Sequence, residues 1–235
     1  MNILKAINYE DLSSKAGTIV SAQVLKKPDS VLGFATGSTP LGLYDKLVKA
    51  YETGLVDFSH INSFNLDEYI GLSKENEQSY NYFMHKNLFN KINIPAENVN
   101  IPDGLSEDLG VEVNNYERKI EGAGGIDLQI LGIGHNGHIG FNEPDKFFTR
   151  RTGVVQLTES TIAANSRFFN HKDDVPKYAI SMGIETIMNT RSILILISGK
   201  DKSEIMNKMI NSPITPEVPA SVLQLHKDVT LIYCD

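Results

Sequence analysis

The most informative group of side chains capable of acid–base chemistry lies in one glycine-rich stretch, residues 132–144, which reads GIGHNGHIGFNEP. It contains two imidazoles, His135 and His138, and the carboxylate of Glu143. A neutral histidine can accept a proton from a hydroxyl group near pH 7 and return it. Neighbours such as Glu143 and Asn136 can set its orientation and charge. The stretch therefore predicts one catalytic imidazole; the alternative is a histidine that only stabilises a tight loop.

The same stretch contains a GxGxxG pattern, formed by Gly132, Gly134 and Gly137. A dinucleotide-binding turn must open a helix, and an acid about 20 residues on should end the next strand. Here the glycines continue into HIGFNEP, a poor helix start, and the next strand ends in Gln156-Leu157. We therefore expect no nucleotide cofactor.

His135 and His138 also form an HxxH pair, which raises the question of a metal. A catalytic zinc site needs a third ligand, and usually a helix that presents the pair. The loop is glycine-rich, no second histidine cluster exists, and the single cysteine, Cys234, excludes a zinc site built on cysteines. We expect no metal.

Two adjacent acids, Asp67 and Glu68, follow an apolar run at 61–66. Adjacent side chains on a strand point to opposite faces, so only one of the two can readily face a given ligand. A carboxylate beside a C–H that is acidified by a carbonyl or iminium can act as a general base. Capping of a helix or turn is an equally good interpretation from these residues alone.

Three segments have features of an anion site. In Thr36-Gly37-Ser38-Thr39-Pro40, Thr39 suits a helix N-cap and Pro40 the first helical position, so that unpaired N–H groups and hydroxyls would face a ligand. An ordinary capped helix is the alternative. Lys202 opens a helix, and a cation is unfavourable at that end of a helix unless an anion lies beside it. A lysine that is simply solvated is the alternative. Arg167 suits bidentate phosphate binding or a structural ion pair.

The elements that would position these side chains are short apolar runs, which alternate along the chain with segments whose apolar residues recur at a helical period. This pattern predicts one α/β domain over residues 1–235, a doubly wound and mostly parallel sheet with helices on both faces. In such folds ligands bind beyond the carboxyl ends of the strands, where the segments above lie. The expected strands are 31–36, 61–67, 125–134, 154–157, 178–181, 192–198 and 229–233, and the expected helices are 41–54, 79–92, 106–122 and 202–210.

Bulk properties narrow the class of protein. The net charge of −7 argues against nucleic-acid binding, which needs a basic face, but allows a small anionic ligand. The N-terminus lacks the apolar core of a signal peptide, and no run approaches the roughly 18 apolar residues of a membrane span. We expect a cytoplasmic enzyme with a small-molecule substrate and no membrane partner.

Four motifs occur in matching order and spacing: ATGSTP, NLDEYIGL, GHIGFNEP and TIAANSRFF. Together they closely resemble glucosamine-6-phosphate deaminases over residues 30–205. GHIGFNEP is the specific element, because 6-phosphogluconolactonases share the glycine–histidine core but lack FNEP. The resemblance implies a modified Rossmann-like sheet, no organic cofactor and no required metal.

Roles for individual residues also follow from the resemblance. It assigns abstraction of the sugar C2 proton to Asp67 rather than Glu68. It assigns ring opening to His138, supported by Asn136 and Glu143. The family's GxxK spacing selects Lys202 over Lys200. The phosphate group of the substrate would be held by Gly37, Ser38, Thr39, Arg167 and Lys202.

The implied reaction converts glucosamine 6-phosphate and water to fructose 6-phosphate and ammonia. Two alternative functions are a 6-phosphogluconolactonase-like hydrolase, which needs no C2 base, and a non-catalytic sugar-phosphate sensor. Only about 30 residues precede the first expected strand, too few for the DNA-binding helix pair of a sensor. Regulated deaminases carry basic residues where this chain has Gly153 and Val155, so we expect no activation by N-acetylglucosamine 6-phosphate and a small assembly or a monomer.

Overall fold

A seven-stranded parallel sheet forms the centre of the computed structural model, which describes residues 1–169 and 171–235. The strand order is β1-β10-β9-β6-β2-β3-β5, and every neighbouring pair is parallel. Its strands are β1 (Asn2–Lys5), β2 (Val31–Phe34), β3 (Asn62–Asn65), β5 (Val99–Asn100), β6 (Leu128–Leu131), β9 (Ser192–Ser198) and β10 (Val229–Cys234). The predicted α/β class with a mostly parallel sheet is confirmed.

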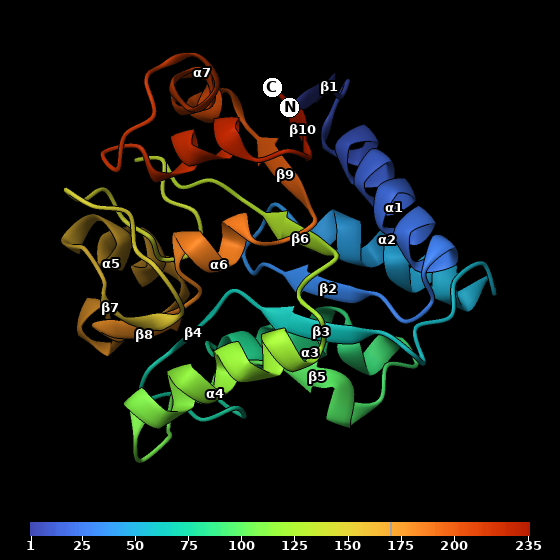
Figure 1. The fold of residues 1–235 in the computed structure, drawn as a ribbon, viewed down its shortest axis with the longest axis horizontal. Coiled ribbons are helices and arrows are strands. Elements are labelled where there is room, and N and C mark those ends of the chain that lie inside the picture. The colour runs from blue at the N-terminus through green and yellow to red at the C-terminus, as the bar shows by residue number, and fades with distance from the viewer. Residues whose placement is uncertain (170) are drawn as a thin grey trace.

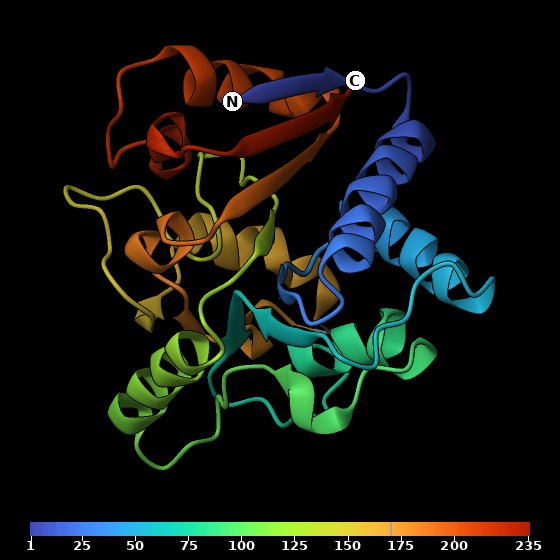
Figure 2. The ribbon, with the colours of Figure 1, turned by 45° about the vertical axis from the view of Figure 1, so that its right-hand side comes forward.

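Helices cover both faces of this sheet, as predicted (Figures 1 and 2). One face carries α1 (Tyr9–Lys26), α2 (Leu41–Glu52) and α3 (Tyr80–Asn87). The other carries α4 (Leu109–Gly122), α6 (Ile184–Met188) and α7 (Ser203–Asn211). Right-handed crossovers explain the division, because the chain reverses its direction across the sheet after β5. No helix in the described ranges is both long and apolar enough to cross a lipid bilayer.

A second, three-stranded antiparallel sheet lies beside the main one, in the order β4-β8-β7. Its strands are β4 (Asp67–Tyr69), β8 (Tyr178–Ser181) and β7 (Gly153–Gln156). The strand predicted over 61–67 is present as β3, but its end differs: β3 stops at Asn65, and Asp67 opens a strand of the small sheet. The runs at 154–157 and 178–181 also belong to this sheet, because β7 and β8 pair with each other and β8 pairs with β4. Alternate residues of β7 are half-buried and exposed.

Several elements escape prediction from the sequence. The longest is α1, whose buried side chains Leu12, Ala16 and Val20 are interspersed with serine, threonine and lysine, so its apolar period is weak. Strands β1 and β5 and helices α6 and α5 (Glu159–Asn165) are too short for a recognisable pattern of apolar residues. The four predicted helices are present; the one expected over 79–92 ends at Asn87 and continues as a 3₁₀ turn, Phe89–Lys91.

Because the main sheet is parallel, the carboxyl ends of β2, β6 and β9 meet at one edge. The segments after them are 35–40, 132–144 and 199–202, which contain most of the predicted site residues. The small sheet adds Asp67, paired in register with Ser181, and is packed through a minor core that includes Tyr69, Phe141 and Ile162.

Candidate active site

The two adjacent acids have different environments. Glu68 accepts hydrogen bonds from the backbone N–H groups of Tyr69, Tyr80 and Asn81 at 2.8, 2.9 and 2.7 Å. It thereby satisfies free donors at the start of α3. Asp67 is buried, and its carboxylate has no hydrogen-bond partner within the described residues. Glu68 is thus the structural cap and Asp67 the acid left free for a ligand.

Burial, and to a lesser degree the neighbouring charge of Glu68, raises the pKa of Asp67 from 3.8 to about 8. Burial also raises the pKa of Glu68, to about 7, against its backbone hydrogen bonds, which lower it. A carboxyl group whose pKa lies near the working pH suits general-base chemistry.

The raised pKa of Asp67 makes folding stability depend on pH. The unfolded carboxyl ionises near pH 3.8 and the folded one near pH 8, so between these values the folded state binds more protons. The free energy of unfolding therefore falls as pH rises through that window. We expect an Asp67→Asn variant, which cannot ionise there, to gain in Tm relative to the unsubstituted protein between about pH 5 and about pH 8. A Tm difference independent of pH would contradict an unpaired, buried Asp67.

The glycine-rich stretch brings His138 to the same place. It forms a loop after β6, and at Gly140 an added Cβ would lie 3.6 Å from Oδ2 of Asp67. Next to it, the N–H of Phe141 donates to the hydroxyl of Ser181 at 3.1 Å, and Ser181 is the strand partner of Asp67. His138, two residues before Gly140, therefore belongs to the same site as Asp67.

The imidazole of His138 is held by a small network. Its Nδ1 lies 3.4 Å from Oε2 of Glu143, an ion-pair distance, and has no hydrogen-bond partner in the part of the chain that the structure describes. Asn136 donates to the same oxygen at 2.6 Å, and the hydroxyl of Thr161 donates to Oε1. Burial alone would raise the pKa of Glu143, but His138, Thr161 and Asn136 outweigh it and hold the pKa at about 2. Glu143 is thus an anion that orients the ring and leaves Nε2 free.

Gly134 lies directly against this ring. A Cβ there would be 2.2 Å from Cε1 of His138, closer than any real contact, so only glycine permits the observed ring position. His135 points elsewhere: its side chain is 67% exposed, and its Nδ1 is 3.6 Å from Asp201. Among residues 1–169 and 171–235, no three His, Cys, Asp or Glu side chains lie together in a way that could hold a metal.

The loop between β2 and α2 presents unpaired donors. Gly37 has φ +104°, and the N–H groups of Gly37, Ser38 and Thr39 have no partner in the described part of the chain. The expectation that Thr39 caps α2 is wrong: the capping position is Pro40, and no side chain of the loop bonds to the helix end. The hydroxyls of Ser38 and Thr39 consequently remain free for a ligand.

Cations lie on the neighbouring rim. Nζ of Lys202 donates to the carbonyl of Ile133, two residues after β6, at 3.1 Å. Burial lowers the pKa of Lys202, the charge of Arg167 lowers it further, and Asp201 opposes both. Arg167 follows α5 in a 3₁₀ turn, Ser166–Phe168, and its effect on Lys202 places the two cations near each other. Lys200 is exposed.

Sequence reasoning missed the hydroxyl of Thr161, which contacts Glu143, and Ser181, which links Asp67 to the loop. Neither has a local signal, because each contact joins segments far apart in the chain.

Comparison with known proteins gives a consistent result. Residues 9–232 match the family model described as glucosamine-6-phosphate isomerases/6-phosphogluconolactonase. A glucosamine-6-phosphate deaminase of Lachnoclostridium phytofermentans is 56% identical over 234 residues, which is 100% of this chain and 99% of the relative. One of Clostridioides difficile is 54% identical, covering 99% and 93%.

Solved structures agree. A monomeric glucosamine-6-phosphate deaminase superimposes with a TM-score of 0.97 at 44% identity, covering 100% of this chain and 97% of that one. A 6-phosphogluconolactonase from Thermotoga maritima shares the fold, with a TM-score of 0.76 at 21% identity, covering 99% and 98%. The chain belongs to the glucosamine-6-phosphate isomerase/6-phosphogluconolactonase family.

Proposed function

We propose that this protein is a glucosamine-6-phosphate deaminase, which converts glucosamine 6-phosphate and water to fructose 6-phosphate and ammonia. Relatives that are 53–56% identical over nearly the whole chain bear this name. The observation that carries the proposal is a buried carboxylate, Asp67, that has no hydrogen-bond partner among the described residues and lies in one site with an imidazole oriented by an anion, His138. Ammonia release from glucosamine 6-phosphate tests it.

Ring opening is the first step. Glu143 faces Nδ1 of His138, so the proton on that nitrogen is favoured and Nε2 can act as the base. Nε2 accepts the proton of the anomeric hydroxyl and helps to return one to the ring oxygen, which opens the pyranose. The contact with Glu143 thus orients the imidazole before the substrate binds, so the reaction does not have to supply that free energy.

Isomerisation and deamination follow on the open chain. Asp67, as a carboxylate, removes the proton from C2 and delivers one to C1 through an enediol-like intermediate. C2, which is the ketone carbon of the product, still bears the nitrogen at this point. Water therefore adds at C2, and ammonia leaves. A lactonase would need no base at this position, and the free state of Asp67 therefore favours the deaminase over 6-phosphogluconolactone hydrolysis.

The phosphate group would lie against the N–H groups and hydroxyls of the 37–39 loop, with Lys202 and Arg167 opposite. We expect Lys202→Met to raise KM for glucosamine 6-phosphate about 10- to 100-fold, because a charge-assisted hydrogen bond to phosphate is lost. The matched variant Lys200→Met, which removes an equal charge two residues away, should leave KM within about twofold. The reverse order of effects would transfer the role to Lys200.

We also propose that the protein works as a monomer without an allosteric activator. In the segment 151–155 the only cation is Arg151, and Glu117 and Glu121 already engage it, with Nη2 at 3.2 Å from Oε2 of Glu117. Gly153 and Val155 offer no charge to a second phosphate. We expect hyperbolic kinetics that N-acetylglucosamine 6-phosphate leaves unchanged. A sigmoidal curve, or a lower half-saturating concentration with that sugar, would refute this.

A further inference from the structure

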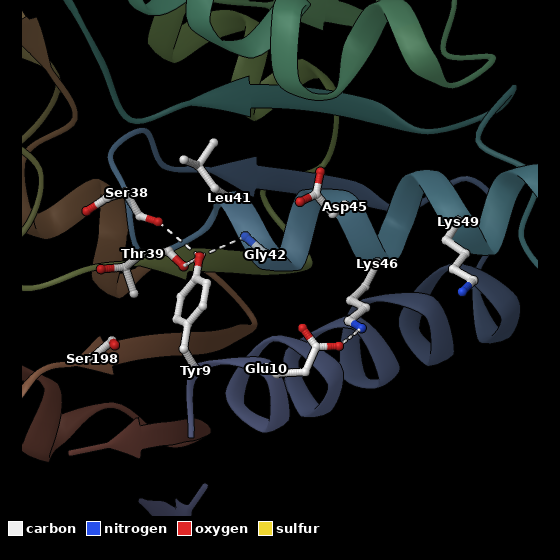
Figure 3. Close-up of a pocket in the computed structure, with 10 residues that line it drawn as sticks. All are labelled: Tyr9, Glu10, Ser38, Thr39, Leu41, Gly42, Asp45, Lys46, Lys49 and Ser198. Carbon is white, nitrogen blue, oxygen red and sulfur yellow. Dashed lines mark hydrogen bonds and ion pairs between the residues drawn. The ribbon is translucent and has the colours of Figure 1, made fainter. Parts of the chain in front are cut away.

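The phenol of Tyr9 joins α1 to the loop that precedes α2. Its hydroxyl lies 3.0 Å from the carbonyl oxygens of both Ser38 and Thr39, and the N–H of Gly42 donates to it at 2.8 Å (Figure 3). One hydroxyl therefore donates to the loop and accepts from the first turn of the helix. Tyr9 and the loop border a pocket of about 570 Å³, which also includes Ser198 at the end of β9.

Tyr9 does for α2 what a capping side chain ordinarily does. The N-cap position, Pro40, has no side-chain donor or acceptor, and no residue of the loop caps the helix. The Tyr9 hydroxyl satisfies one of the free N–H groups at this end instead. The hydroxyls of Ser38 and Thr39 are thus released from capping, and in Figure 3 both point away from the phenol.

The same contacts fix the direction of a peptide group. In a planar trans peptide the C=O and the N–H point in opposite directions. The carbonyl of Ser38 points at Tyr9, so the N–H of Thr39 points away from it, toward the side of the two free hydroxyls. Without the phenol hydroxyl this peptide could turn over and present a carbonyl oxygen where an anion needs a donor.

The packing of the two helices keeps the phenol in place. At Gly42 an added Cβ would lie 2.2 Å from Oγ of Ser13 and 3.1 Å from Cε1 of Tyr9, so α1 and α2 touch here without an intervening side chain. The hydroxyl of Ser13 donates to the carbonyl of Tyr9 at 2.7 Å, which ties it into the first turn of α1.

We infer that Tyr9 is a positioning residue for substrate phosphate: its hydroxyl holds the Ser38–Thr39 peptide with its N–H, and both loop hydroxyls, turned toward the phosphate group. The inference rests on the proposed function, because it takes the 37–39 loop as the phosphate site. It predicts that loss of the hydroxyl weakens phosphate binding and leaves the chemistry at Asp67 and His138 intact.

The test is the Tyr9→Phe variant, which keeps the ring and removes only the hydroxyl. We expect KM for glucosamine 6-phosphate to rise about tenfold and kcat to stay within about twofold. The inhibition constant of inorganic phosphate, measured with the same protein, should rise by the same factor as KM. A purely structural role would instead lower Tm and kcat and leave the inhibition constant of phosphate unchanged, which would refute the inference.

Tyr51→Phe is the matched control, since this tyrosine lies on α2 and its hydroxyl has no hydrogen bond within the described residues. It should leave KM and the phosphate inhibition constant unchanged. Equal effects of the two variants would overturn the role of Tyr9. If the unsubstituted protein releases ammonia and binds phosphate but Tyr9→Phe changes neither constant, only the inference fails. If the unsubstituted protein binds neither phosphate nor the sugar phosphate, the proposed function fails as well.

Discussion

Replacing Asp67 with asparagine is expected to lower kcat for glucosamine 6-phosphate by about three to four orders of magnitude, the upper range for loss of a general base. The amide keeps the size of the side chain but cannot accept the C2 proton. KM should change little, because the substitution leaves the groups proposed to hold the phosphate, the 37–39 loop and Lys202, unaltered. Steady-state assays of ammonia release measure both constants, and a kcat within about tenfold of the unsubstituted protein would remove Asp67 from the base role.

Exchange at C2 provides a second measurement of the same step. In deuterated water the unsubstituted protein should exchange protons between substrate and solvent during turnover, and Asp67→Asn should not. Glu68→Gln is the matched control, because Glu68 uses its oxygens to accept three backbone N–H groups. It should lower Tm and retain C2 exchange. Exchange lost in Glu68→Gln and kept in Asp67→Asn would reverse the assignment of the two acids.

The second large effect is expected at His138. His138→Gln should lower kcat about 10²- to 10³-fold, because the anomeric proton then has no base. Ring opening would become rate-limiting, so the kinetic isotope effect of glucosamine 6-phosphate deuterated at C2 should shrink toward 1. An undiminished isotope effect in this variant would place His138 outside ring opening.

His135→Gln is the control for His138. It lies in the same loop, but its ring is exposed and contacts Asp201 rather than Glu143. We expect kcat to stay within about twofold. A loss comparable to that of His138→Gln would show that the loop needs both histidines and that one imidazole alone does not carry the chemistry.

The sequence sufficed to place the acids, the glycine–histidine loop and the β2–α2 loop at one edge of a parallel sheet. Apolar strands that alternate with helices indicate a parallel sheet, and in such a sheet the segments after the strands lie at its carboxyl edge. The small antiparallel sheet could not be predicted from the sequence, because the runs at 154–157 and 178–181 are as apolar as short parallel strands. Only their pairing with each other and with β4 distinguishes them.

Within the site, the choice between neighbouring residues needed three-dimensional contacts. Asp67 and Glu68 are equivalent as a sequence pair, and the three N–H groups on Glu68 separate them. Tyr9 was missed altogether. Its contact with Gly42 spans 33 residues and joins two helices, one of which has too weak an apolar period to be predicted.

The central claim is that this site opens a sugar ring and removes a C2 proton from an amino sugar phosphate. The most direct measurement incubates the purified protein with glucosamine 6-phosphate and, separately, with 6-phosphogluconolactone. We expect ammonia and fructose 6-phosphate in equal amounts from the first and no hydrolysis above the uncatalysed rate from the second. Lactone hydrolysis that persists in Asp67→Asn, with no ammonia released from glucosamine 6-phosphate, would contradict the claim.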